Sequence, residues 1–159
     1  MPEPISPNCS YEAATRSRTA LRLGIDNTPS AETLERMYDV ARECYEPAVA
    51  HFGFRIPISS FYRSAALNRA IGGAAKSQHL TGEAIDLDCD GTLVSNRALS
   101  DYFRRRGNFD QLIAEYPRSD GTPEWVHVSW SRTRNRGSVL VAEKVDGRTV
   151  YQPYRQGVS

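Results

Sequence analysis

Two short stretches of polar residues constrain the fold of this chain more than any other feature. They are SQHLTGEAID, which begins at Ser77, and EWVH, which begins at Glu124, and together they hold two of the chain's three histidines. His79, Asp86 and His127 supply three candidate zinc ligands, and Glu124 is a spare carboxylate. A catalytic zinc commonly takes three protein ligands and keeps one position for water, whose proton a nearby carboxylate can move. The fold is therefore expected to bring both stretches around one Zn²⁺ ion.

Two nearby residues, Asp88 and Cys89, are weighed against Asp86 for the role of metal ligand. Asp88 and Asp90 would share one face with Asp86 on an extended strand, and clustered carboxylates are costly to bury unless a cation offsets them. Asp88 is therefore the main alternative ligand. Cys89 would point away from Asp86, because strand side chains alternate between faces, so a buried structural thiol is favoured there.

Glu124 and His127 present a geometric problem. On a regular strand, residues three apart face opposite sides, so these two side chains could not both face one metal. We therefore expect Glu124 at the entrance of the strand or in a bulge, where Pro123 makes a break in pairing plausible. Trp125 and Ser129 would share the face of His127.

The composition is that of an ordinary globular domain. Of 159 residues, 40% are apolar and 25% are charged, and the length predicts a single domain over residues 1–159. A net charge of +1 provides no global field for nucleic acid, and no segment approaches the ~20 apolar residues of a membrane-spanning helix. The first residues lack the features of a secretory signal. We therefore predict synthesis in the cytoplasm, with no nucleic-acid binding and no membrane insertion.

The three cysteines are predicted to be free thiols. Cys9, Cys44 and Cys89 are an odd number, are widely spaced and form no CxxC pair. This usage is typical of a reducing compartment rather than of a disulfide framework.

The clearest helical pattern runs from about residue 28 to residue 51. A capping hydroxyl beside Pro29 marks its start, and apolar residues then recur at helical spacing. Pro47 is expected to kink or end this helix early, and Gly53 supplies a later stop. Residues 1–30, with several Pro, Ser, Thr and Asn, are predicted to be mostly irregular and to wrap the domain.

The remaining segments predict a mixture of strands and short helices. Pro57 places the first strand at a sheet edge. Because the elements show no βαβ regularity, the predicted class is α+β, a single domain with an antiparallel sheet and flanking helices. The predicted elements are strands over 54–62, 84–89, 109–116 and 125–130, a hairpin of 139–143 and 149–151 turning near Asp146-Gly147, and helices over 64–70 and 95–106.

With these residues established, the chain resembles the zinc D-Ala-D-Ala carboxypeptidase family, which includes hedgehog-type peptidases among bacterial cell-wall enzymes and phage endolysins. The resemblance continues upstream of the metal motifs, to Arg16–Ala20, Leu23–Pro29 and Tyr62–Ser64. The family pattern Ser-x-His-x-x-Gly-x-Ala-x-Asp and the closing Glu-x-x-His are matched at Ser77, His79, Gly82, Ala84, Asp86, Glu124 and His127.

The resemblance implies roles for individual residues in a hedgehog/D-Ala-D-Ala carboxypeptidase-like fold. It makes His79, Asp86 and His127 the ligands of one Zn²⁺ ion. Glu124 would be the general base and acid, and Arg63 would stabilise the oxyanion or hold a substrate carbonyl.

Further substrate contacts are implied on both sides of the metal. Ser77 would help to position the substrate or the metal shell, and Tyr62 and Trp125 are candidate contacts. The family commonly has Gly two residues before the Arg, where this chain has Phe61. The bulky ring of Phe61 is therefore expected to narrow the substrate cleft.

The implied function is hydrolysis of an amide bond in the peptide stem of bacterial peptidoglycan. A D-Ala-D-Ala carboxypeptidase, an L-Ala-D-Glu endopeptidase and a soluble D,D-dipeptidase all fit the same metal site. The enzyme would reach the cell wall if released by a holin or carried in a virion, which makes virion components candidate partners.

A different class of function is the alternative. The chain would then be a non-catalytic module of a virion tail or baseplate, and Asp88 or Cys89 closing the fourth zinc position would favour it. The basic runs at 104–106 and 132–136 are predicted to be solvated surface, with contact to an anionic cell-wall polymer as the alternative.

Overall fold

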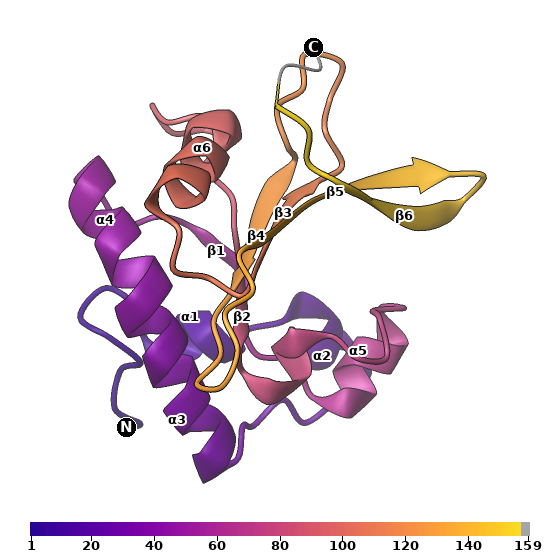
Figure 1. Ribbon diagram of the computed structural model, residues 1–159. Coiled ribbons are helices and arrows are strands. Elements are labelled where there is room, and N and C mark those ends of the chain that lie inside the picture. The colour runs from indigo at the N-terminus through magenta and orange to yellow at the C-terminus, as the bar shows by residue number, and fades with distance from the viewer. Residues whose placement is uncertain (157–159) are drawn as a thin grey trace.

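A six-stranded sheet runs through the molecule in the order β1-β2-β4-β3-β5-β6 (Figure 1). Neighbouring strands are antiparallel except β3 and β5, which are parallel. The predicted α+β class is confirmed, and the sheet is mixed at this one pair. The computed structural model describes residues 1–156, and its strands are β1 (Ile58–Ser60), β2 (Ala84–Leu87), β3 (Gln111–Glu115), β4 (Trp125–Ser129), β5 (Ser138–Val145) and β6 (Arg148–Pro153).

The parallel pair follows from which strand edges remain free. β4 is flanked by β3 on one side and β2 on the other. The chain reverses after β4, so β5 joins the sheet at the remaining edge of β3 and runs in the same direction as β3. β1 lies at the opposite edge of the sheet, as Pro57 predicted.

The two faces of the sheet differ in chemistry, because side chains alternate along each strand. One face packs against α3 and α6, and each apolar side chain fully buried there contributes roughly 1.5–3 kcal/mol. The other face carries Asp86 and His127. The buried apolar side chains of the first face are Ile85, Leu87, Leu112, Val126 and Val128.

The long predicted helix is present, and Pro47 does not end it. Pro47 has no N–H and leaves the carbonyl of Glu43 without its helical partner. A π-helical turn precedes Pro47, and the Glu43 carbonyl accepts a 2.8 Å hydrogen bond from Arg106 Nη1 instead. The continuous segment consists of α3 (Ala31–Val40), the π turn (Ala41–Tyr45) and α4 (Glu46–Phe52).

Two short helices lie in the N-terminal segment that was predicted to be mostly irregular. They are α1 (Tyr11–Thr15) and α2 (Arg18–Leu23). Each follows a capping serine whose side chain accepts a hydrogen bond from a backbone N–H, Ser10 from Ala13 and Ser17 from Ala20. Most of residues 1–30 is irregular, as predicted. The two helices form because N-terminal caps offset their short length and weak apolar pattern.

The other predicted helices and the hairpin are confirmed. Ser64 caps α5 (Ala65–Ala70) and Ser95 caps α6 (Asn96–Arg106). The β5–β6 hairpin turns at Asp146 and Gly147 and projects from the body of the molecule (Figure 1). Within residues 1–156, no helix has the length and apolar character needed to cross a membrane.

Candidate metal centre

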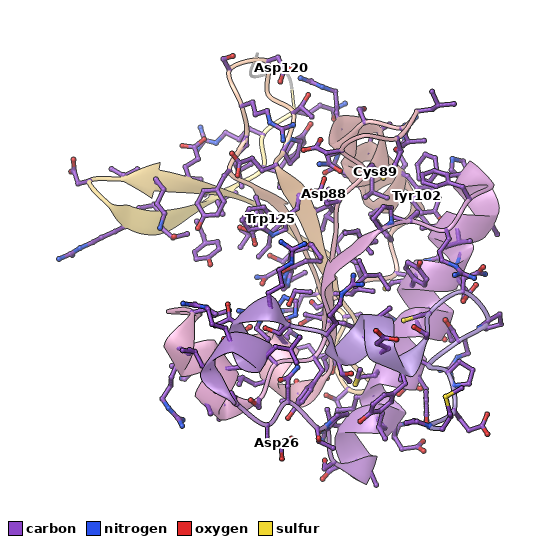
Figure 2. The ribbon with its side chains drawn as sticks, turned by 180° about the vertical axis from the view of Figure 1, so that it is seen from behind. Asp26, Asp88, Cys89, Tyr102, Asp120 and Trp125 are labelled. Carbon is purple, nitrogen blue, oxygen red and sulfur yellow. The ribbon has the colours of Figure 1, made fainter. Side chains whose placement is uncertain are left out.

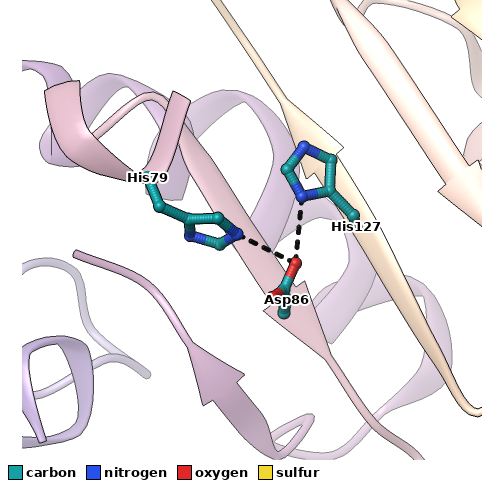
Figure 3. Close-up of side chains that lie close together, drawn as sticks. All are labelled: His79, Asp86 and His127. Carbon is teal, nitrogen blue, oxygen red and sulfur yellow. Dashed lines mark hydrogen bonds and ion pairs between the residues drawn. The ribbon is translucent and has the colours of Figure 1, made fainter. Parts of the chain in front are cut away.

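His79, Asp86 and His127 lie together on the polar face of the sheet (Figure 3). Asp86 comes from β2 and His127 from β4, and the 3-10 turn Gln78–Thr81 carries His79. Asp86 Oδ1 is 3.1 Å from His79 Nε2 and 3.0 Å from His127 Nδ1. The structure thus brings the three predicted ligands together, with their ligand atoms all within 4.8 Å of one another.

The local fold explains this meeting of distant residues. Asp86 and His127 are direct cross-strand partners in the β2–β4 ladder, so their side chains share one face. The turn of His79 ends at Gly82, which has φ +77° and lies against α3. A Cβ at Gly82 would come within 2.8 Å of the Met37 side chain, so the glycine of the motif permits this close approach.

The ring of His79 is oriented for metal binding through Nε2. Its Nδ1 is 2.6 Å from the carbonyl oxygen of Phe61, and a carbonyl only accepts, so Nδ1 carries the proton. Nε2 keeps its lone pair, is buried, and has no hydrogen-bond partner among the described residues. A histidine ligand held by a backbone carbonyl in this way is a recurring arrangement at metal sites.

Asp86 supplies the negative charge that a divalent cation needs. Burial raises the pKa of its carboxyl, but His79 and His127 outweigh burial and hold the pKa well below its usual range. The group is therefore ionised at neutral pH, as metal binding requires. Two imidazoles and one carboxylate form the ligand set of a catalytic zinc with one open position, so these residues fit the ion.

Asp88 and Cys89 do not join this cluster. β2 ends at Leu87, so the strand alternation does not extend to them. Asp88 Oδ1 accepts hydrogen bonds of 2.9 Å from the Asn96 side chain and from the backbone of Asp90. Cys89 is 1% exposed in the core, toward α6 and away from Trp125 (Figure 2). Within the described residues, neither closes the fourth ligand position.

The metal cluster lies in a cleft of about 970 Å³, the size of pockets that bury most of a bound ligand. The face of β3 and β4 forms its floor. The loop between α5 and the His79 turn lines it on one side, and the β5–β6 hairpin lines it on the other. Its residues include Arg63, Ser77, Ile113, Glu115, Tyr116, Trp125, Lys144 and Tyr151.

Glu115 is a carboxylate in this cleft that the sequence did not single out. It ends β3 and pairs with Trp125 across the β3–β4 ladder, so it shares the face of Trp125 and His127. Its side chain is buried, which raises its pKa to about 7 against the opposing effects of His127 and Arg63. Because Glu115 is not one of the three clustered ligands, it is the spare carboxylate of the site.

The structure places Glu124 at the entrance of β4, as predicted, but outside the cleft. Its side chain is exposed and does not line the cleft. Asp90 is the carboxylate that raises the pKa of the Arg118 guanidinium most, and Glu124 also raises it. Glu124 therefore belongs to the group of charges around Arg118. Its backbone N–H donates a 2.9 Å hydrogen bond to the carbonyl of Glu115. Because the ladder pairs Glu115 with Trp125, this bond is one residue out of register.

Arg63 lines the cleft as predicted. Its Nη1 donates a 3.2 Å hydrogen bond to Asn68 Oδ1, and its Nε is buried without a partner among the described residues. Burial lowers the pKa of the guanidinium, while Asp86 and Glu115 raise it. Arg63 therefore has a buried donor that no described protein group satisfies.

The remaining predicted contacts divide into two groups. Ser77 and Trp125 line the cleft, and Ser77 Oγ also accepts the His79 N–H at 3.3 Å. Phe61 is 2% exposed in the hydrophobic core, so the expectation that its ring narrows the cleft is wrong. The reason is that only its carbonyl points toward the site. Tyr62 packs against the same core and does not line the cleft.

Two imidazoles and a carboxylate in an open cleft, with a spare carboxylate beside them, define a zinc-hydrolase type of site. The family model Peptidase M15 matches residues 7–129, a range that contains every residue of this cluster. The chain belongs to the Peptidase M15 family, so it is a metallopeptidase by family, and the predicted resemblance is confirmed. A comparison with curated proteins found no match.

Proposed function

We propose that this chain is a zinc peptidase that hydrolyses an amide bond in the peptide stem of bacterial peptidoglycan. The observation that carries the proposal is the open two-histidine, one-aspartate cluster in a cleft that also holds Glu115 and Arg63. Membership of the Peptidase M15 family supports the same chemistry. A D-Ala-D-Ala carboxypeptidase and an L-Ala-D-Glu-type endopeptidase remain the two candidate specificities.

The chain's own residues divide the chemical work. His79, Asp86 and His127 would hold a Zn²⁺ ion, which would supply Lewis acidity and make the attacking water more acidic. Glu115 takes the proton of the attacking water and delivers a proton to the leaving amine. Arg63 donates hydrogen bonds to the oxygen that becomes negative during attack.

The assignment of the general base to Glu115 is tested by a matched pair of variants. Glu115→Gln is expected to retain one zinc per chain while losing about 100- to 10,000-fold in turnover, the usual contribution of a positioned acid–base group. Glu124→Gln, an identical change outside the cleft, is expected to stay within a few-fold of the wild type. Turnover of stem peptides and zinc content measured on the same preparations would decide. Loss of activity in Glu124→Gln alone would return the role to Glu124.

The structural virion module has no observation in its favour. A purely structural zinc usually has a fourth protein ligand, and Asp88 is instead engaged by Asn96. We propose that the enzyme meets the cell wall after release by a holin or within a virion. Lysis assays with and without a co-expressed holin test that route.

A further inference from the structure

A second, smaller pocket adjoins the metal cleft. Its volume is about 510 Å³, and hydroxyl side chains form much of its lining. Four residues line both cavities and so mark their junction: Lys76, Ser77, Gln78 and Arg134. The two cavities therefore adjoin at these four residues.

The loop between β4 and β5 presents Arg134 at the junction. Arg132 Nε pairs with Asp39, and Arg136 Nε pairs with Asp110 Oδ1 at 2.7 Å. Arg134 lies between these two anchored arginines, is exposed, and forms no ion pair or hydrogen bond within residues 1–156. The loop is thus fixed on both sides of an arginine whose guanidinium has no protein partner there.

Lys76 is presented from the opposite loop in a similar way. Asn68 Nδ2 and the backbone N–H of Ser77 both donate to the carbonyl of Ala74, at 2.9 and 3.1 Å. These bonds hold the loop that follows α5. The ammonium group of Lys76 is exposed, and no carboxylate of the described chain lies in ion-pair contact with it.

Asp110 connects the two loops. Its fully buried carboxylate accepts a hydrogen bond of 2.9 Å from Gln78 Nε2 and bonds of 2.7 and 3.0 Å from Arg136. Gln78 lies in the turn that follows Lys76, and Arg136 lies two residues after Arg134. One buried carboxylate therefore bonds to both of the segments that carry the two unpaired cations.

The charge balance at the junction favours an anionic group. Asp110 is neutralised by Arg136, and Glu83 accepts a 2.7 Å hydrogen bond from Thr81 on the wall of the smaller pocket. Lys76 and Arg134 outnumber Glu83, the one remaining carboxylate among the residues that line the smaller pocket.

We propose that Lys76 and Arg134 form a subsite for a carboxylate of the peptide substrate, at the junction of the cleft and the smaller pocket. The inference rests on the proposed peptidase function and adds a substrate feature to it. Arginine and lysine bind carboxylates through charge-assisted hydrogen bonds. Two carboxylates of a stem peptide have this chemistry, that of an internal D-Glu and that of the C-terminus.

Paired substrates and variants test the subsite. The kcat/KM values are measured for stem peptides that have the D-Glu carboxylate free or amidated, and for peptides that have the C-terminus free or amidated. The wild type is expected to prefer one free carboxylate by about 10-fold or more, the contribution of a hydrogen bond between charged groups. Lys76→Gln and Arg134→Gln should each reduce that preference, and the double variant should abolish it.

Matched controls and a binding measurement separate this inference from the proposed function. Arg69→Gln and Arg148→Gln remove exposed cations outside both cavities and should leave the preference unchanged. The affinities of the same peptides for zinc-loaded Glu115→Gln protein, with and without the double change, are measured by calorimetry and do not depend on turnover. Equal binding of free and amidated peptides, or a preference that survives the double change, overturns the subsite even if hydrolysis occurs. Absence of hydrolysis with a preference that the double change removes overturns the proposed function and supports the subsite.

Discussion

The side chain of Arg63 reaches the cleft beside residue 73, where only glycine leaves room for the guanidinium. A Cβ at Gly73 would overlap Asn68 Oδ1 and would lie 2.9 Å from Arg63 Nη1. These are the two groups whose hydrogen bond holds the guanidinium in place. The absence of a side chain at residue 73 is therefore part of the site, although residue 73 carries no chemistry itself.

Gly73→Ala is expected to lower kcat while leaving zinc content unchanged. Displacement of Arg63 removes part of the ~100- to 1,000-fold that a preorganised oxyanion donor typically supplies. Arg63→Ala provides the upper limit for the same measurement. A Gly73→Ala enzyme with wild-type kcat would show that Arg63 does not depend on this packing.

The three cysteines are expected to be inert in the folded protein. Burial raises the pKa of Cys9 and Cys44 to about 12 and that of Cys89 to about 11. The thiolate is the reactive form, so its population at pH 8 is very small. A thiol reagent at pH 8 should label none of them rapidly until denaturant is added, and then all three. Rapid labelling of the folded chain would contradict the burial.

The candidate metal ligands could be predicted from the sequence, whereas the carboxylate that we propose as the general base could not. His79, Asp86 and His127 have distinctive spacing and chemistry. Glu115 lies in an ordinary strand pattern, and its role depends on β3 being the neighbour of β4. Strand order is a property of the whole sheet, so the sequence around Glu115 contains no local signal for it.

Individual helices and strands show which local sequence signals are enough to predict where an element begins or turns. Serine caps place the starts of α5 and α6, and the Asp146-Gly147 pair places the hairpin turn. The helix around Pro47 was harder to predict, because a partner from a distant element satisfies the freed carbonyl. The parallel pairing of β3 and β5 likewise depends on which sheet edge is free, and β3 has a free edge because β2 occupies the other side of β4.

α6 is expected to contribute to stability mainly through its apolar side. Phe103 is 1% exposed in the core, so Phe103→Ala should lower the free energy of unfolding by about 3–5 kcal/mol through lost burial and a cavity. Arg105→Ala, on the exposed side of the same helix, should change it by about 0.5 kcal/mol or less. Denaturant unfolding of the zinc-loaded proteins measures both. A small effect of Phe103→Ala would contradict the packing of α6 on the sheet.

The molecule as a whole is expected to be more stable with zinc than without it. Its ligands come from two strands and a turn, so the ion joins segments that are distant in sequence. At a free zinc concentration of 100 times Kd, binding should add about 2.7 kcal/mol to the free energy of unfolding. Chelation should therefore lower Tm, and His127→Ala should remove the difference between the two conditions. An unchanged Tm on chelation would mean that the cluster does not hold the ion.

The central claim is zinc-dependent cleavage of the peptidoglycan peptide stem. The most direct test is digestion of purified peptidoglycan and defined muropeptides with and without a chelator, followed by mass spectrometry. We expect products that disappear with the chelator and return with zinc, and their masses would identify the bond. Zinc-loaded, folded protein that releases no product from walls, muropeptides or free D-Ala-D-Ala would contradict the claim.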